Sequence, residues 1–244
     1  MQGGSGLRRP VVIPGKNIKG MAVLFVLTVM TGLILSVFYQ ASAAVVSQLN
    51  TKYSVVIDAG HGGYDPGAIT KQGVYEKEIN LEMAKRVQEL LKPCGINVIL
   101  TRDEDEDYVP KGAQGKHTKK QADLNYRIFM ATQAKVDAFI SLHLNATVTG
   151  LNSGAETFYH FKSNEGKILA ETIQQELVKV PGMNRRIAKP GDFYIIKNSP
   201  MPTVIVELGY LSNPKEQKKL QESWYQDQLA HAVAKGISNY FRLP

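Results

Sequence analysis

Cysteine is almost absent from this sequence. The 244 residues contain one, Cys94, so no disulfide bond can form within the chain. A single thiol also argues against zinc sites built from several thiolate ligands. Internal repeats are absent too, and nothing indicates a second globular domain. A metal site in this chain would therefore use histidine and carboxylate ligands within one main domain.

Charged residues are absent from residues 20–51. Within that stretch, residues 21–39 are almost wholly apolar, close to the ~20 residues that span a bilayer. Four basic residues and no acid precede it, which predicts a cytoplasmic N-terminus. We therefore expect a disordered basic cytoplasmic tail over residues 1–20 and a transmembrane anchor or signal peptide over residues 21–45.

Two interpretations of residues 21–45 remain open. The apolar stretch is longer than the roughly 7–15 residues of a secretory signal, which favours a retained anchor. The small residues at 41–43, Ala-Ser-Ala, instead resemble a signal-peptide cleavage site. Both interpretations predict that the chain from Lys52 onward is exported. Export without disulfides is typical of a bacterial envelope protein.

Part of the excess positive charge comes from basic residues that precede the apolar segment. The net charge is +7, and removing the four basic residues among the first 50 leaves +3. So small an excess is a weak argument for an anionic partner, and we expect no nucleic-acid partner. With 43% hydrophobic and 21% charged residues, the chain is expected to be globular.

Apolar strands and amphipathic helices alternate through the exported part. Strands are expected at 53–58, 96–100, 138–142, 154–161, 193–196 and 203–206, and helices near 79–91, 124–131, 168–180 and 229–241. This order predicts a single α/β domain, a mostly parallel twisted sheet with helices on both faces. The polar segment 103–120 is expected to be a loop at a functional edge.

One strand ends in an unusual loop. Residues 55–63 read VVIDAGHGG, three β-branched residues followed by three glycines around His61. Open α/β sheets place their ligands at the carboxyl ends of strands, where His61 is expected. His143 and Glu207 likewise follow apolar strands, and Glu76 precedes the first helix. All four side chains are therefore expected on one edge of the sheet.

Two imidazoles and a carboxylate form a standard ligand set for catalytic zinc, and a second carboxylate can take a proton from water. Ligand chemistry alone does not exclude other divalent ions. Considered one at a time, His61, His143 and Glu207 could each be an ordinary polar residue at the surface, and Glu76 could simply begin a helix. The glycine loop could instead cradle phosphate, but it lacks the usual nucleotide-binding spacings, and Glu76 would repel a phosphate. The remaining histidines, His117, His160 and His231, lack this placement.

Several motifs in order resemble the zinc-dependent N-acetylmuramoyl-L-alanine amidases of the amidase-3 family. They are DAGHGG at 58–63, DPGA at 65–68, EKEINL at 76–81, LTRD at 100–103, SLHLNA at 141–146 and VELGYLSN at 206–213. The resemblance covers residues 53–242, the expected catalytic domain. It implies one Zn²⁺ ion held by His61, Glu76 and His143, with Glu207 as the catalytic carboxylate.

The resemblance further implies hydrolysis of the amide between the lactyl group of N-acetylmuramic acid and L-alanine of peptidoglycan. The segment 110–116 and the apolar N-terminal stretch are most similar to the sporulation or germination-specific type. That type implies a role in spore-cortex muramic-δ-lactam formation, with a muramoyl de-N-acetylase or accessory protein as partner. It also implies an envelope location, in the space between forespore and mother-cell membranes. Residues 144–153 leave no room for the autoinhibitory helix of some relatives.

Two other functions remain open on the sequence. One is a non-catalytic peptidoglycan-binding module, although such a module need not keep Glu207. The other is a zinc hydrolase acting on another cell-wall amide. Only the amidase leaves a free lactyl carboxylate on the glycan.

Overall fold

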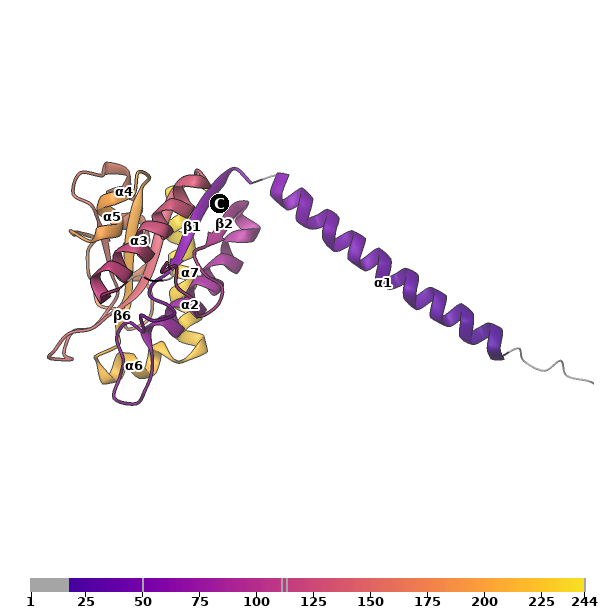
Figure 1. The fold of residues 1–244 in the computed structure, drawn as a ribbon, viewed down its shortest axis with the longest axis horizontal. Coiled ribbons are helices and arrows are strands. Elements are labelled where there is room, and N and C mark those ends of the chain that lie inside the picture. The colour runs from indigo at the N-terminus through magenta and orange to yellow at the C-terminus, as the bar shows by residue number, and fades with distance from the viewer. Residues whose placement is uncertain (1–17, 50, 111, 113, 244) are drawn as a thin grey trace, which may run out of the picture. The chain divides into compact units, whose positions relative to one another are not determined.

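The computed structural model describes residues 18–49, 51–110, 112 and 114–243, which form two units that divide at residues 49 and 50 (Figure 1). The first unit is the helix α1 (Ile18–Leu49). By length and hydropathy together, no helix in the described part of the chain qualifies as a membrane span. Of the tail expected over 1–20, residues 1–17 lie outside the described residues and the last three begin α1.

The second unit contains a six-stranded sheet in the order β2-β1-β3-β6-β4-β5. Its strands are β1 (Tyr53–Ala59), β2 (Ile96–Leu100), β3 (Ala138–Asn145), β4 (Glu156–Tyr159), β5 (Lys189–Pro190) and β6 (Thr203–Tyr210). The strands β2, β1, β3 and β6 pair in parallel, while β4 runs antiparallel to β6. The mostly parallel sheet predicted from the sequence is confirmed.

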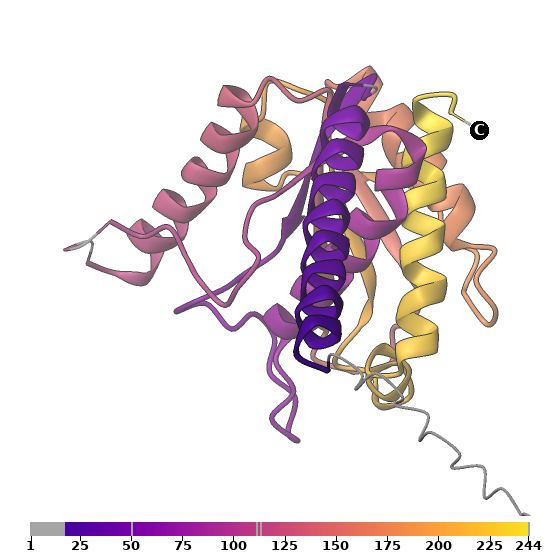
Figure 2. The same cartoon turned by 90° about the vertical axis from the view of Figure 1, so that its right-hand side faces the viewer.

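Helices cover both faces of the sheet, as predicted (Figure 2). One face carries α2 (Glu76–Leu91), α4 (Asn164–Leu177) and α7 (Ser223–Tyr240), and the other carries α3 (Lys116–Gln133) and α5 (Tyr194–Asn198). Side chains of β1 alternate between two cores: Val55 and Ile57 lie in the larger core and Val56 in the smaller. A strand buried on both faces reads as a continuous apolar run, which explains the uninterrupted sequence of β1.

The helix α2 places a ligand candidate at the sheet edge. It starts at Glu76 and buries Ile79, Met83 and Val87, which recur every fourth residue and so lie on one face of the helix. A 3-10 turn (Lys92–Cys94) follows α2, and Gly95 then adopts a left-handed φ of 70° before β2 begins. Packing along the whole helix therefore fixes the position of its first residue.

Two predictions about local structure are wrong. Residues 193–196 were expected to form a strand, but Tyr194–Asn198 is the helix α5. A run of four apolar residues does not distinguish strand from helix by periodicity. Here Ile195 and Ile196 are both buried in the same smaller core, whereas successive residues of a strand point to opposite faces. The loop expected over 103–120 ends early, because α3 begins at Lys116. The short α6 (Pro214–Leu220) and β5 were not predicted.

Candidate metal centre

Three of the predicted site residues meet at the carboxyl edge of the sheet. His61 lies two residues beyond β1, His143 lies near the end of β3, and Glu76 is the first residue of α2. One ligand atom from each residue can be chosen so that all three atoms lie within 4.8 Å of one another. The parallel arrangement of β1 and β3 brings together residues that are up to 82 positions apart in the sequence.

The carboxylate of Glu76 lies between the two imidazoles. Its Oε1 is 3.2 Å from Nε2 of His61 and 3.1 Å from Nδ1 of His143. The two rings meet edge to face, with centroids 4.8 Å apart and planes at 80°. The nitrogen of each ring that faces Glu76 is therefore the one available to a shared ion.

Several backbone and side-chain donors hold Glu76 in this position. The amide of Leu144 donates to Oε1 (3.0 Å), the amide of Ala68 donates to Oε2 (2.8 Å), and Asn80 Nδ2 donates to Oε1 (3.3 Å). Glu76 is only 4% exposed. Burial favours the neutral acid, but hydrogen bonds with His143 and His61 prevail and hold the pKa of Glu76 well below its usual range. The carboxylate is therefore ionised.

A second carboxylate orients His61. Asp65 Oδ2 lies 2.9 Å from His61 Nδ1, which leaves Nε2 directed at Glu76. Carboxylates that bind the far nitrogen of a metal-ligating histidine fix its tautomer and ring orientation. Burial lowers the pKa of His61, yet the hydrogen bonds to Asp65 and Glu76 outweigh it and raise the pKa to about 9. Two anions thus stabilise positive charge at this point, and a divalent cation would gain from the same field.

Two glycines allow this close packing. A Cβ atom at Gly60 would overlap the imidazole of His143. At Gly67, with φ of 68°, a Cβ atom would lie 2.6 Å from Glu76 Oε2 and 2.8 Å from His61 Cδ2. The glycines of the two motifs thus leave room for the ligand side chains as well as for the turns.

Glu207 lies beside this cluster. It pairs in register with His143 across β3 and β6. Its side chain is half-buried, and Oε2 is buried with no hydrogen-bond partner among the described residues. Burial raises the pKa of Glu207 to about 7, and the negative charge of Glu76 adds to the shift. A carboxyl group poised near neutrality has the proton affinity expected of a general base.

The donor set and its spacing fit zinc. Ligand bonds of ~2.1 Å at tetrahedral angles place neighbouring ligand atoms ~3.4 Å apart. Glu76 Oε1 lies 3.1 and 3.2 Å from the two imidazole nitrogens, so small movements would admit an ion. Two neutral imidazole nitrogens and one carboxylate oxygen leave a fourth position for water or substrate, as in catalytic zinc sites.

Two other histidines, His160 and His231, do not join the cluster. His160 stacks at a tilt on Phe161, and His231 bonds through Nδ1 to the Asp227 carbonyl within α7. The side chain of His117 lies outside the described ones. The positions of His160 and His231 agree with their predicted lack of a role at the site.

Sequence reasoning missed the groups that support the ligands. Asp65 was not recognised as the partner of His61, although a carboxylate four residues after a ligand histidine is a usable signal. The buried arginines Arg102 and Arg127, which bind the backbone around His61, were also missed. Nothing in their local sequence pattern indicates partners 41 and 66 residues away.

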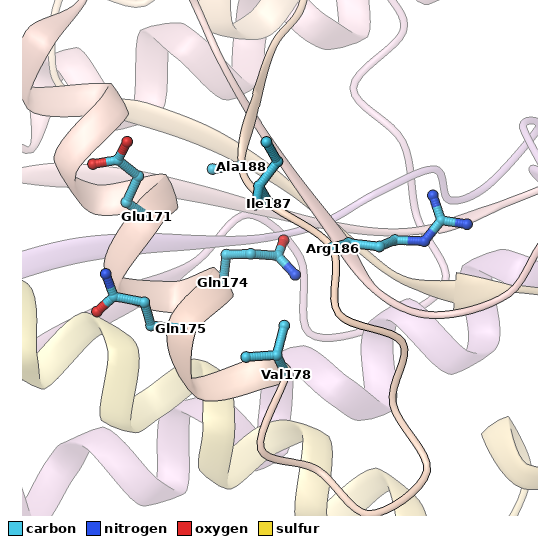
Figure 3. Close-up of a pocket in the computed structure, with 7 residues that line it drawn as sticks. All are labelled: Glu171, Gln174, Gln175, Val178, Arg186, Ile187 and Ala188. Carbon is cyan, nitrogen blue, oxygen red and sulfur yellow. The ribbon is translucent and has the colours of Figure 1, made fainter.

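A separate cavity of about 330 Å³ lies between α4 and the segment 186–188 (Figure 3). It is lined by Glu171, Gln174, Gln175, Val178, Arg186, Ile187 and Ala188. The guanidinium of Arg186 points away from the other lining residues and binds Ser153 O and Glu156. The four predicted site residues are not among those that line it, so this cavity is distinct from the candidate metal centre.

Comparison of the sequence with known proteins shows one family. The family model Amidase_3, described as N-acetylmuramoyl-L-alanine amidase, matches residues 55–239. The germination-specific N-acetylmuramoyl-L-alanine amidase of Bacillus subtilis is 37% identical over 188 residues, which cover 77% of this chain and 79% of that protein. The N-acetylmuramoyl-L-alanine amidase LytC of the same organism is 36% identical over 191 residues, covering 78% of this chain and 36% of LytC.

Solved structures of amidases also resemble this chain. The CwlD amidase from Clostridioides difficile, determined in complex with the GerS lipoprotein, superposes with a TM-score of 0.75 at 36% identity, covering 78% of this chain and 99% of that chain. The catalytic domain of CwlV from Bacillus (Paenibacillus) polymyxa gives a TM-score of 0.68 at 32% identity, covering 79% of this chain and 99% of that chain.

Proposed function

Because this chain belongs to the N-acetylmuramoyl-L-alanine amidase family, we propose that His61, Glu76 and His143 hold one zinc ion and that Glu207 is its general base. The chain is an N-acetylmuramoyl-L-alanine amidase, and its substrate is peptidoglycan. The bond it cleaves is the amide between the lactyl group of N-acetylmuramic acid and L-alanine. The observation that carries the site assignment is the meeting of three ligand atoms within 4.8 Å at the sheet edge.

Zinc supplies Lewis acidity when bound: it lowers the pKa of a water from about 15.7 toward ~7 and polarises a carbonyl. The residues of the chain supply the rest. Asp65 holds the tautomer of His61, and the amides of Ala68 and Leu144 fix Glu76. These contacts preorganise the ligand atoms, so little reorganisation is needed when an ion binds.

Glu207 moves the proton. Its Oε2 has no hydrogen-bond partner among the described residues and is therefore free to accept the proton of the attacking water. As the C–O bond forms and the C–N bond breaks, the same carboxyl group returns that proton to the departing amine of L-alanine. The products are a free lactyl carboxylate on the glycan and a free stem peptide.

The test is digestion of purified sacculi by the purified chain. Zinc-loaded protein should release stem peptides, protein treated with a chelator should not, and added zinc should restore release. Mass spectrometry of the products separates this reaction from peptidase or deacetylase activity, since only the amidase leaves a lactyl carboxylate. Metal analysis that finds no zinc in active protein would contradict the proposed cofactor.

A role in the spore cortex is part of the proposal. It is supported by similarity to the germination-specific amidase and to CwlD. In this role the chain would prepare muramic acid for de-N-acetylation and δ-lactam formation. Cortex peptidoglycan from spores that lack the chain should then contain no muramic-δ-lactam, and a Glu207→Gln copy should not restore it. Normal δ-lactam content without the chain would instead indicate a role in general wall turnover.

Location and partners complete the proposal. Because peptidoglycan lies outside the cytoplasmic membrane, the catalytic unit acts there, and residues 21–45 would serve as the export signal. The CwlD neighbour was solved with a lipoprotein, which supports an accessory partner for this chain as well. Fractionation followed by immunoblotting tests the first point, and copurification from sporulating cells tests the second.

A further inference from the structure

Two buried arginines outside the predicted ligand set bind the backbone turn that carries His61. Arg102, which follows β2, is 2% exposed, and Arg127, in α3, is 1% exposed. We propose that Arg102 and Arg127 are positioning residues that hold His61 in the orientation needed to bind the metal, and thereby set the zinc affinity of the site. This inference rests on the proposed metal site.

Arg102 joins the segments of two ligands. Its Nε donates to the carbonyl oxygens of Ala59 (3.0 Å) and His61 (2.8 Å). Its Nη2 donates to the carbonyl oxygens of Gly60 (3.2 Å) and Lys77 (2.7 Å). Lys77 directly follows Glu76 in the first turn of α2. One guanidinium therefore fixes the turn that bears His61 against the helix end that bears Glu76.

Arg127 binds the same turn from the other face of the sheet. Its Nη1 donates to the carbonyl of Ala59 (2.9 Å) and to Asp58 Oδ1 (2.6 Å), and its Nη2 donates to the carbonyl of His61 (2.8 Å). Its Nε donates to Asp123 Oδ2 (2.8 Å) within α3. The two carboxylates offset the burial of this cation, so the guanidinium remains charged and fixed in place.

The turn needs these donors because its backbone is unusual. His61 has a φ of 63°, a left-handed conformation that residues other than glycine rarely adopt. The carbonyls of Ala59 and His61 accept hydrogen bonds from both guanidinium groups, and the carbonyl of Gly60 accepts one from Arg102. Arginine offers five donors in a planar fork, whereas lysine offers a single ammonium point. Replacement by lysine should therefore keep the charge but release part of the turn.

A role in positioning and a role in stability alone predict different results. If the arginines only join β2 and α3 to the sheet, their loss lowers the melting temperature and leaves the zinc affinity of the folded protein unchanged. If they orient His61, the zinc affinity falls. Substitution of groups that orient metal ligands typically weakens metal binding 10–100-fold.

The experiment compares Arg102→Lys and Arg127→Lys with the matched control Arg86→Lys in the full chain. Arg86 binds Glu82, Ser223 and Asp227, joining α2 to α7, and these partners lie outside the His61 turn. Zinc affinity is measured by competition with a chromogenic chelator, and the melting temperature of the metal-free protein is measured in parallel. We expect 10–100-fold weaker zinc binding for the first two variants and less than a twofold change for the control. The visible absorption of the cobalt-substituted protein should change for the same two variants only.

A milder variant keeps the test decisive if a lysine variant does not fold. Asp123→Asn removes the anchor of Arg127 without touching the turn, and zinc binding should weaken by less than the 10–100-fold expected for the arginine variants. Unchanged zinc affinity in every folded variant overturns the inference and leaves the proposed function intact. A wild-type protein that binds no zinc overturns both, because the metal site itself would then be wrong.

Discussion

His143 and Glu207 lie opposite each other in the register of two adjacent parallel strands, β3 and β6. Neighbouring strands are ~4.8 Å apart, so the sheet itself sets the distance between the proposed ligand and the proposed base. The core strands on both sides of this pair are buried, which leaves little freedom for that distance to change. Catalytic groups carried by a rigid sheet need little loop closure to reach working geometry.

Replacing Glu207 should separate metal binding from turnover. We expect Glu207→Gln to lower kcat for release of stem peptides about 10²–10⁴-fold, because the proton acceptor is lost while the ligands remain. Zinc content, measured by elemental analysis, should stay at one ion per chain. Wild-type turnover by this variant would show that another group takes the proton.

Replacing a proposed ligand should remove zinc as well as turnover. His61→Ala removes one of the three proposed zinc ligands and should abolish stoichiometric zinc and, with it, activity. His160→Ala is the matched control, since His160 contacts Phe161 and lies outside the ligand cluster. Elemental analysis after dialysis is the measurement. Full zinc occupancy in His61→Ala would contradict the ligand assignment.

Glu207 should make the metal-free protein less stable, relative to Glu207→Gln, as pH rises from 4.5 to 7. The folded state keeps a proton on Glu207 up to about pH 7, whereas the unfolded chain releases it near pH 4.5. Between these values the folded state binds more protons, so raising the pH favours unfolding. Relative to Glu207→Gln, the wild type should lose on the order of 2 kcal/mol of unfolding free energy across this window. Urea unfolding at four pH values measures the difference, and parallel curves for the two proteins would argue against a raised pKa.

Gly60 should be intolerant of any side chain. A Cβ atom there would overlap the His143 ring, so Gly60→Ala should displace that ligand and weaken zinc binding at least 10-fold. Gly73→Ala is the control: its Cβ would meet open space, and its φ of 79° costs about 1 kcal/mol of stability without affecting the site. Chelator competition on both variants checks this, and equal affinities would refute the steric argument.

The contact between α4 and α7 should matter for stability but not for zinc. A Cβ atom at Gly236 would lie 2.5 Å from the Cα atom of Ile173, so Gly236→Ala must push the two helices apart. Overpacking of this kind costs about 1–3 kcal/mol. Urea unfolding should reveal that loss, while the zinc affinity of the folded variant stays within twofold of wild type. A zinc affinity that fell with stability would indicate that the site depends on this helix pair.

The sequence predicted the sheet and the position of the site because both follow from local rules. An apolar run that stops at His61 or before Glu207 marks the carboxyl end of a buried strand, and parallel strands bring such ends together. It did not predict α5, since Ile195 and Ile196 suit either a strand or a helix. Periodicity carries no information on such short runs, so only the packing of the smaller core decides between them.

The sequence did not indicate the roles of the two buried arginines for a different reason. Arg102 and Arg127 bind carbonyl oxygens, and the backbone has no side-chain signature in the sequence. Their partners in the turn at His61 lie 41–68 positions away and become neighbours only after the sheet has assembled. The structure therefore reveals a buried charge that binds main-chain atoms, whereas the sequence does not.

The carboxylate of Glu76 accepts hydrogen bonds from the backbone amides of residues 68 and 144 and contacts the imidazoles of His61 and His143. These contacts form only after β1, α2 and β3 have packed together, so a partly folded chain lacks the proposed metal site. Under the proposed mechanism, metal binding and hydrolysis would therefore both depend on completed folding, and an unfolded chain would be inactive.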